Sequence, residues 1–173
     1  MKKFAIIGLI LIVLNGCVTM NTYPPPPGFE GLADVSAEPF PTLMAEAIRY
    51  AQIHYGSVGE DIAINLPPGT PSSVYLRVSQ ILGGGHAQFD SEEPAYHIVE
   101  VRLKTLAANV DIYYPRKELY HEFVTMSFTQ DLFGNYTVKH TRLWRITKNP
   151  PEPNYRDPAM NAVSAPTDPD DEP

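Results

Sequence analysis

Cysteine is almost absent from this sequence, since Cys17 is the only one among 173 residues. A single cysteine cannot form a disulfide within the chain or supply the several thiolates of a structural zinc site. The five histidines do not replace it, because they are scattered without the short spacing of metal ligands: His54, His86, His97, His121 and His140. The sequence therefore predicts no metal site and no cofactor.

Long apolar runs are also missing. The longest uncharged apolar stretch, Phe4 to Leu14, has eleven residues and follows Lys2 and Lys3. A membrane-spanning helix needs roughly twenty apolar residues. A basic start, a short apolar middle and a small residue before a cut are typical of an export signal. We therefore predict a signal peptide over residues 1–16; the alternative is an uncleaved anchor from Phe4 to Met20 with an idle cysteine.

The residues around the cysteine resemble the lipobox of bacterial lipoproteins. Leu14-Asn15-Gly16-Cys17 has an aliphatic residue three positions before the cysteine and glycine directly before it. The resemblance implies cleavage ahead of Cys17 and its acylation, which would make the membrane a partner and leave no thiol for catalysis. Several acyl chains anchor a protein stably to a bilayer. The implied location is the cell envelope on the extracytoplasmic side, and Val18 resembles the residue of lipoproteins sent to an outer membrane where one exists.

Basic residues are few. Without Lys2 and Lys3 the chain has 11 basic against 20 acidic residues, a net charge of about −9 with neutral histidines. This balance argues against nucleic acid as a partner and against an electrostatic grip on anionic lipid.

Catalytic motifs are incomplete. His121-Glu122 begins like a zinc-protease helix, but threonine stands at position 125 where that motif has histidine. Gly83-Gly84-Gly85 follows an expected helix instead of opening one, so it offers no helix amino terminus to a phosphate. We expect no catalytic residues.

Proline is abundant at both ends of the chain, where eleven of the 18 prolines lie. Consecutive prolines favour an extended, solvated chain, and the last residues are acidic with few apolar clusters. We therefore predict a proline-rich tether over residues 17–37, one folded domain over 38–147 and a disordered acidic tail over 148–173.

Two amphipathic helices are predicted at the start of the domain. Apolar residues recur at three-and-four spacing from Phe40 to Tyr55, and Gly56 ends the pattern. A second helix should begin with Thr70 as N-cap and Pro71 at the first helical position and end before Gly83.

The remaining pattern predicts strands. Asp61 to Leu66 alternates apolar and polar residues, and from Tyr96 onward the period is two. If Leu106 to Asn109 forms a four-residue loop, Leu103 faces Ile112. The same pairing around Asp131 to Asn135 places Phe128 opposite Val138. The predicted fold is α+β, with two helices on a mainly antiparallel sheet that consists of a four-stranded meander and one short strand.

Two constellations are candidates for function. The outer face of the sheet should present aromatic and arginine side chains, a composition typical of interface hot spots that suits an envelope protein or a glycan. This candidate interaction surface consists of Arg102, Tyr113, His121, Phe123, Leu143 and Arg145. On the helix side, Glu122, His140 and Arg142 interrupt an apolar set and would have to pair if buried, which would form a candidate pocket. The apolar set consists of Tyr120, Val124, Met126 and Trp144.

These observations favour a membrane-anchored envelope lipoprotein with a non-catalytic interaction or accessory domain. The alternative is a small-ligand-binding or hydrolytic pocket beneath the sheet. A bulge near His140 to Arg142 would turn the polar residues of that pocket to solvent instead.

Overall fold

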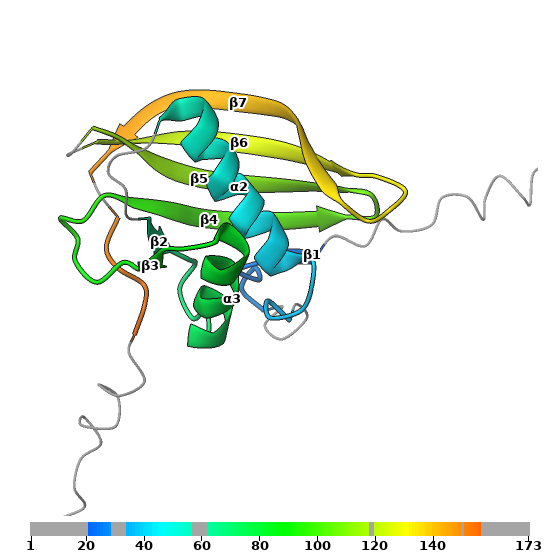
Figure 1. The fold of residues 1–173 in the computed structure, drawn as a ribbon, viewed down its shortest axis with the longest axis horizontal. Helices are drawn as coiled ribbons and strands as arrows, with labels where there is room; N and C mark the ends of the chain where they lie inside the picture. Colours follow the sequence, from blue (N-terminus) through cyan, green and yellow to red (C-terminus); the bar gives the residue numbers. More distant parts are fainter. Residues whose placement is uncertain (1–20, 29–33, 57–61, 118–119, 150, 157–173) are drawn as a thin grey trace, which may run out of the picture.

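A computed structural model describes residues 21–28, 34–56, 62–117, 120–149 and 151–156. The predicted signal peptide and Cys17 lie outside this part of the chain. Two helices and seven strands follow one another in the described residues (Figure 1): β1 (Asn21–Tyr23), α2 (Phe40–Tyr55), β2 (Ala63–Asn65), α3 (Ser72–Leu82), β3 (His86–Ala87), β4 (Ala95–Lys104), β5 (Ala107–Lys117), β6 (Tyr120–Gln130) and β7 (Tyr136–Lys148). No helix in the described ranges is long and apolar enough to cross a membrane.

Helix α2 confirms the predicted helix from Phe40 to Tyr55. Pro39 occupies the N-cap and Pro41 lies in the first turn, where a missing N–H costs nothing. The apolar stripe is buried along its length, and Leu43, Met44 and Ile48 have no exposed area. The helix ends at Gly56, whose φ of 90° is open to glycine without a Cβ clash.

Helix α3 begins one position later than predicted. Pro71 is the N-cap in extended conformation, so Thr70 does not cap the helix as expected. The Thr70 hydroxyl instead donates a 2.6 Å hydrogen bond to the carbonyl of Pro67, which closes the turn before the helix. Gly83 ends the helix as predicted, in the left-handed conformation, with its N–H bonded to the carbonyls of Ser79 and Gln80.

The predicted fold class is wrong in its sheet. The sheet has seven strands and is mixed, because β2 runs parallel to both β3 and β4. The strand order is β3-β2-β4-β5-β6-β7, and β1 pairs antiparallel with the far part of β4, on residues 101–103. Helix α3 connects β2 to β3 as a crossover, which is the connection that parallel strands require. β1 and β3 were missed because two or three residues carry no readable period.

The register of the first hairpin also differs from the prediction. Leu103 lies opposite Ala108 and not opposite Ile112. The turn between β4 and β5 has two residues, Thr105 and Leu106, where a four-residue loop was expected. A shorter loop moves every cross-strand partner along the strand.

The second hairpin contains two irregularities. Phe128 lies opposite Val138 as predicted, but Ser127 pairs with His140, so Lys139 is an extra residue on β7. A second shift in register lies between two pairs, Val124 with Leu143 and Glu122 with Thr147. The predicted bulge therefore exists one residue earlier than expected, and it determines which later β7 side chains face each side.

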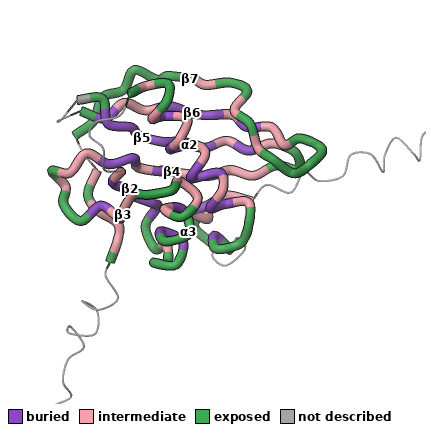
Figure 2. Tube along the Cα trace, in the orientation of Figure 1, coloured by how far each residue is buried: buried purple, intermediate pink, exposed green. Residues whose placement is uncertain are grey.

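Both helices lie on one face of the sheet (Figure 1), and the core fills the space between them and β4, β5 and β6. Figure 2 shows the alternation of buried and less buried residues along these strands and the exposure of most of β7. We call the other side, which no helix of the described chain covers, the outer face.

The domain includes residues from both flanks that the sequence analysis placed outside it. Strand β1 lies within the predicted tether, and its Tyr23 is buried against Phe40. Within the predicted tail, the N–H of Asn154 donates to Asn65 Oδ1 at 3.0 Å, and Tyr155 packs edge-on against Tyr75. Each flank is joined to the sheet by contacts that a proline-rich composition does not reveal.

Candidate functional site

A row of rings crosses the outer face from β4 to β7. The ring centroids of His97 and Tyr113 lie 6.2 Å apart, those of Tyr113 and Phe123 4.8 Å, and those of Phe123 and Trp144 6.3 Å. Tyr113 pairs directly with both His97 and Phe123 in the sheet, so strand pairing alone places three rings in line. We call these four residues the aromatic row.

A polar row runs beside it across the same four strands. Arg102 Nη1 lies 2.7 Å from Asp111 Oδ2, and Asp111 Oδ1 accepts a 2.6 Å hydrogen bond from the Thr125 hydroxyl. Thr125 Oγ1 in turn accepts a 2.9 Å bond from Trp144 Nε1. Arg102 also binds Glu100 on its own strand. The chain of bonds fixes the edge of the indole ring, so Trp144 is oriented from three strands away.

Strand β7 is the basic edge of an acidic protein. Its 13 residues include Lys139, Arg142, Arg145 and Lys148 and no acidic residue. The guanidinium carbon of Arg142 lies 3.8 Å from the centroid of the Trp144 ring, and Lys148 Nζ lies 5.2 Å from that of Tyr113. Both distances are typical of cation–π contacts. The cations therefore lie directly on the aromatic row.

Large apolar side chains accompany these charges. Leu143, Trp144 and Ile146 are exposed by 48%, 40% and 45%. β7 is also the last strand in the sheet order, so one of its edges has no partner in the described structure. The strand thus combines exposed apolar area, positive charge and an open backbone edge.

Two histidines, the half-buried His97 and the buried His121, lie at the end of the outer face where β4 begins. His121 is 1% exposed, and its Nε2 donates to the carbonyl of Ala95 at 2.8 Å. Burial, together with the nearby His121 and Lys148, lowers the pKa of His97 to about 4, and burial lowers the pKa of His121. Both imidazoles are therefore neutral at pH 7 and add no charge to this face.

The structure brings together four of the six residues of the candidate interaction surface. Arg102, Tyr113, His121 and Phe123 lie on the outer face, as the pairings of β4, β5 and β6 show. Leu143 lies opposite the core residue Val124 and so belongs to the helix side. Arg145 lies in the second irregularity of β7 with a φ of 51°. After the bonds from Tyr114 and Arg116, its charge also lowers the pKa of Glu122, so Arg145 lies near this carboxylate of the helix side. These two placements were wrong because the bulge at Lys139 reverses the alternation after it.

The three residues of the candidate pocket do not converge. Glu122 accepts a 2.7 Å hydrogen bond from the Tyr114 hydroxyl and binds Arg116, on the helix side of the sheet. These bonds lower the pKa of the Glu122 carboxyl. His140 and Arg142 are exposed and lie opposite Ser127 and Thr125, on the outer face. Glu122 thus pairs with Arg116 on β5 and not with Arg142 on β7, and this cluster forms no pocket.

Four residues of the two rows were not among the predicted site residues: His97, Asp111, Thr125 and Trp144. Trp144, the only tryptophan in the chain, was assigned to the helix side by a register without the bulge. Asp111 and Thr125 gave no signal in the sequence, because a hydrogen bond between neighbouring strands depends on register alone.

One further group resembles part of a hydrolase site. His86 Nε2 lies 2.5 Å from Glu93 Oε1, and both His86 and Ser79 line a hollow of about 210 Å³ beside α3. The Ser79 hydroxyl, however, donates to the carbonyl of Gly85 at 2.7 Å. The serine is therefore oriented by the backbone and not by the histidine. In the part of the chain that the structure describes, no three His, Cys, Asp or Glu side chains are grouped to hold a metal ion.

Comparison with known proteins gives no relative: no protein-family model, curated protein or solved structure matches this chain.

Proposed function

We propose that this protein is a lipid-anchored protein of the cell envelope whose domain binds an acidic protein partner through the outer face and strand β7, without catalysis. The lipid anchor is the acylated Cys17 that the lipobox implies. The observation that carries the binding role is the composition of β7, which has four basic residues beside three exposed large apolar ones.

The basic strand stands out against the charge of the whole chain. Four of the 11 basic residues that follow the signal peptide lie on β7. A positive strip on a protein with a net charge of about −9 is complementary to an acidic surface. Aromatic and arginine side chains at the centre of such a strip supply the apolar contact area of interface hot spots.

A simpler explanation of the charges is protection of a sheet edge, because lysine on an edge strand prevents edge-to-edge pairing. Protection does not require exposed apolar residues, yet Leu143, Trp144 and Ile146 are each exposed by 40% or more. An edge strand that served only to prevent edge-to-edge pairing would be expected to carry polar residues at these positions. The combination therefore favours a binding strand.

The cations also bear on the class of partner. A sugar binds an aromatic side chain by stacking on a free ring face. In this structure, Arg142 covers one face of Trp144 and Lys148 lies over Tyr113. Carboxylates of a protein can pair with both cations while the rings remain covered. The arrangement thus favours an acidic protein over a neutral glycan.

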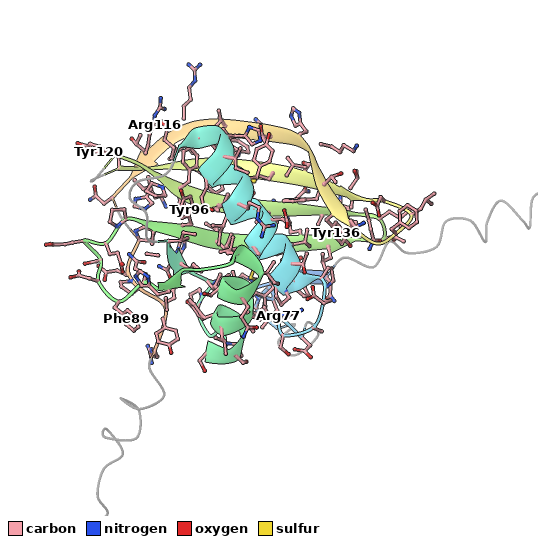
Figure 3. The ribbon with its side chains drawn as sticks, viewed as in Figure 1. Arg77, Phe89, Tyr96, Arg116, Tyr120 and Tyr136 are labelled. Carbon is pink, nitrogen blue, oxygen red and sulfur yellow. The ribbon has the colours of Figure 1, made fainter. Side chains whose placement is uncertain are left out.

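Site-specific photocrosslinking in intact cells tests the binding role. We expect a photoreactive phenylalanine analogue in place of Trp144 to give a discrete protein adduct, and the same analogue in place of Phe89 to give none. Phe89 is a matched control because it is an aromatic residue, 66% exposed, that lies away from β7 (Figure 3). Charge reversal by Arg142→Glu and Lys148→Glu should reduce the adduct at least tenfold. Equal adducts at both positions, or an adduct only with polysaccharide, would contradict the proposal.

The anchor is tested separately. Cells grown with an alkyne-tagged fatty acid should label the wild-type protein and not the Cys17→Ser variant, which should move from the membrane fraction to the soluble fraction. Since Cys17 is the only cysteine, no other thiol can take the label. Label retained by the variant would show that the lipobox reading is wrong.

A further inference from the structure

Two large apolar side chains stand in solvent at the turn between β6 and β7. Leu132 and Phe133 are exposed by 101% and 89%, the highest values among the large hydrophobic residues of the described chain. We call these two residues the tip. Leu106, in the neighbouring turn between β4 and β5, is 64% exposed, and its carbonyl accepts a 2.9 Å hydrogen bond from the N–H of Gln130. Three exposed apolar side chains therefore lie at one end of the sheet.

The turn that carries the tip is held by its own hydrogen bonds. Asp131 Oδ1 accepts from the N–H groups of Phe133 and Asn135 at 2.8 and 2.9 Å. Asp131 Oδ2 accepts from the Asn135 side chain at 3.1 Å, and the Gln130 side chain donates to the carbonyl of Gly134 at 3.2 Å. A turn fixed in this way presents the tip outward with little conformational entropy to lose on binding.

The amino-terminal strand β1 begins at the same end of the sheet. Strand pairing puts four residues in one row: Asn21, Leu103, Ala108 and Phe128. Three steps of about 4.8 Å therefore separate Asn21 from Phe128 across the sheet, roughly 14 Å. β1 runs antiparallel to β4, so β1 begins beside the end of β4 that leads into the β4–β5 turn.

The distances along the strands also match. Cys17 lies four residues before Asn21, so the anchor can extend at most about 14 Å past the row. Leu132 lies four residues after Phe128, and a strand of that length rises about 13 Å. The lipidated residue and the tip can therefore reach one plane at the same time.

We propose that this end of the sheet docks on the lipid bilayer, with Leu132 and Phe133 inserted into the interface between headgroups and acyl chains. The inference rests on the lipid anchor of the proposed function. Docking would orient the strands away from the membrane and leave the outer face and β7 free for the partner.

The bilayer is the occupant that the anchor itself supplies. A short tether keeps the lipid surface at a high effective concentration beside the tip, which no diffusing protein has. Apolar insertion does not need anionic lipid, which suits an acidic chain. The Asp131 carboxylate lies beside the tip, but it accepts hydrogen bonds from three donors of the turn, so it need not be desolvated without partners.

The experiment uses the chain from Cys17 to Pro173 coupled through Cys17 to a maleimide lipid in vesicles of neutral phosphatidylcholine. The coupling makes the test independent of acylation in cells and of the protein partner, so its failure is distinct from a failure of the proposed function. Trp144→Phe removes the only natural tryptophan, and Phe133→Trp places a fluorescent reporter at the tip. Phe89→Trp in the same background is the control, because Phe89 lies at the other end of the view in Figure 3.

We expect the tip reporter to emit at shorter wavelength on vesicles than in buffer and to be quenched by brominated acyl chains, while the control reporter does neither. Adding Leu132→Ser should weaken insertion roughly tenfold, the effect of losing one buried leucine. The proposal would be overturned if the tip reporter emitted at the same wavelength on vesicles as in buffer and was not quenched by brominated acyl chains. Quenching that appears only when anionic phosphatidylglycerol replaces the neutral lipid would also overturn it, because the attraction would then be to charge and not to the apolar interface.

Discussion

The hydroxyl of Thr125 on β6 joins the Trp144 indole on β7 to the buried Asp111 carboxylate on β5. One oxygen accepts from Nε1 at 2.9 Å and donates to Oδ1 at 2.6 Å. Through Asp111 the connection continues to Arg102. The position of the Trp144 ring therefore depends on residues of three other strands.

The fluorescence of Trp144 should report this network directly. Thr125→Val keeps the shape of the side chain but removes the acceptor of the Trp144 hydrogen bond. We therefore expect a more mobile indole, whose fluorescence emission is broader and is quenched more strongly by acrylamide. Stability should fall by about 1 kcal/mol, because Asp111 loses a donor while it keeps Arg102. Ser127→Ala, on the same face of β6, is the control and should leave the quenching unchanged. Identical quenching in Thr125→Val and wild type would show that the bond does not hold the ring.

Removing the guanidinium should uncover the ring. In Arg142→Ala we expect stronger acrylamide quenching of Trp144 and a loss of stability below about 1 kcal/mol, as is usual for an exposed cation–π pair. Lys139→Ala is the control, because it removes an exposed charge of the same strand that contacts no ring. In this variant, acrylamide should quench Trp144 as it does in the wild type. The cation–π contact would be refuted by equal changes in the two variants.

A double-mutant cycle distinguishes the observed partner of Glu122 from the expected one. Glu122→Ala should lower the free energy of unfolding by about 1–2 kcal/mol, because Tyr114 and Arg116 lose their acceptor. Combined with Arg142→Ala the effects should add, since the two side chains lie on opposite faces. Combined with Tyr114→Phe they should not add, because both changes remove the same bond. If urea denaturation showed strongly non-additive effects for Glu122→Ala and Arg142→Ala, the hypothesis of a pocket that contains both residues would be supported instead.

The flank 151–156 should contribute to stability through Asn65. Asn65 is 1% exposed, and its Nδ2 donates to Gln88 Oε1 at 2.7 Å and to the carbonyl of Glu152 at 2.8 Å. Asn65→Ala leaves these buried acceptors and the N–H of Asn154 without partners, so we expect a loss of about 2–4 kcal/mol in chemical denaturation. Faster hydrogen exchange at the Asn154 amide should accompany it. The exposed Thr137→Ala provides a baseline, and an equally small effect in both variants would contradict a structural role for this flank.

Stability should depend on pH through His97. Its folded pKa of about 4 lies below the unfolded value near 6.5, because burial, His121 and Lys148 disfavour the charged form. The unfolded chain thus binds a proton first, and stability that is fully present above pH 6.5 should decline by roughly 2 kcal/mol as the pH falls toward 4. Urea midpoints measured across this range should show a shallower decline in His97→Gln. A variant with the same slope as wild type would show that His97 is not responsible.

The candidate site was predictable only where it depends on local alternation. Tyr113 and Phe123 were assigned to the outer face because residues of one strand alternate between faces, and the two residues pair directly in a regular stretch of β5 and β6. Leu143 and Arg145 were misplaced and Trp144 was missed, because one extra residue at Lys139 reverses the alternation after it. Nothing in the sequence of β7 marks Lys139 as the extra residue.

The sequence alone determined the two helices, since a repeat of apolar residues and the proline and glycine at their ends act within a few positions of the chain. Only the tertiary structure decided the seven-stranded mixed sheet, the faces of β7 and the inclusion of both flanks. β1 pairs with residues 80 positions away, and Asn154 bonds to Asn65 across 89 positions. Such contacts form because the folded backbone must satisfy its donors and acceptors, a condition that depends on the whole chain and leaves no local pattern.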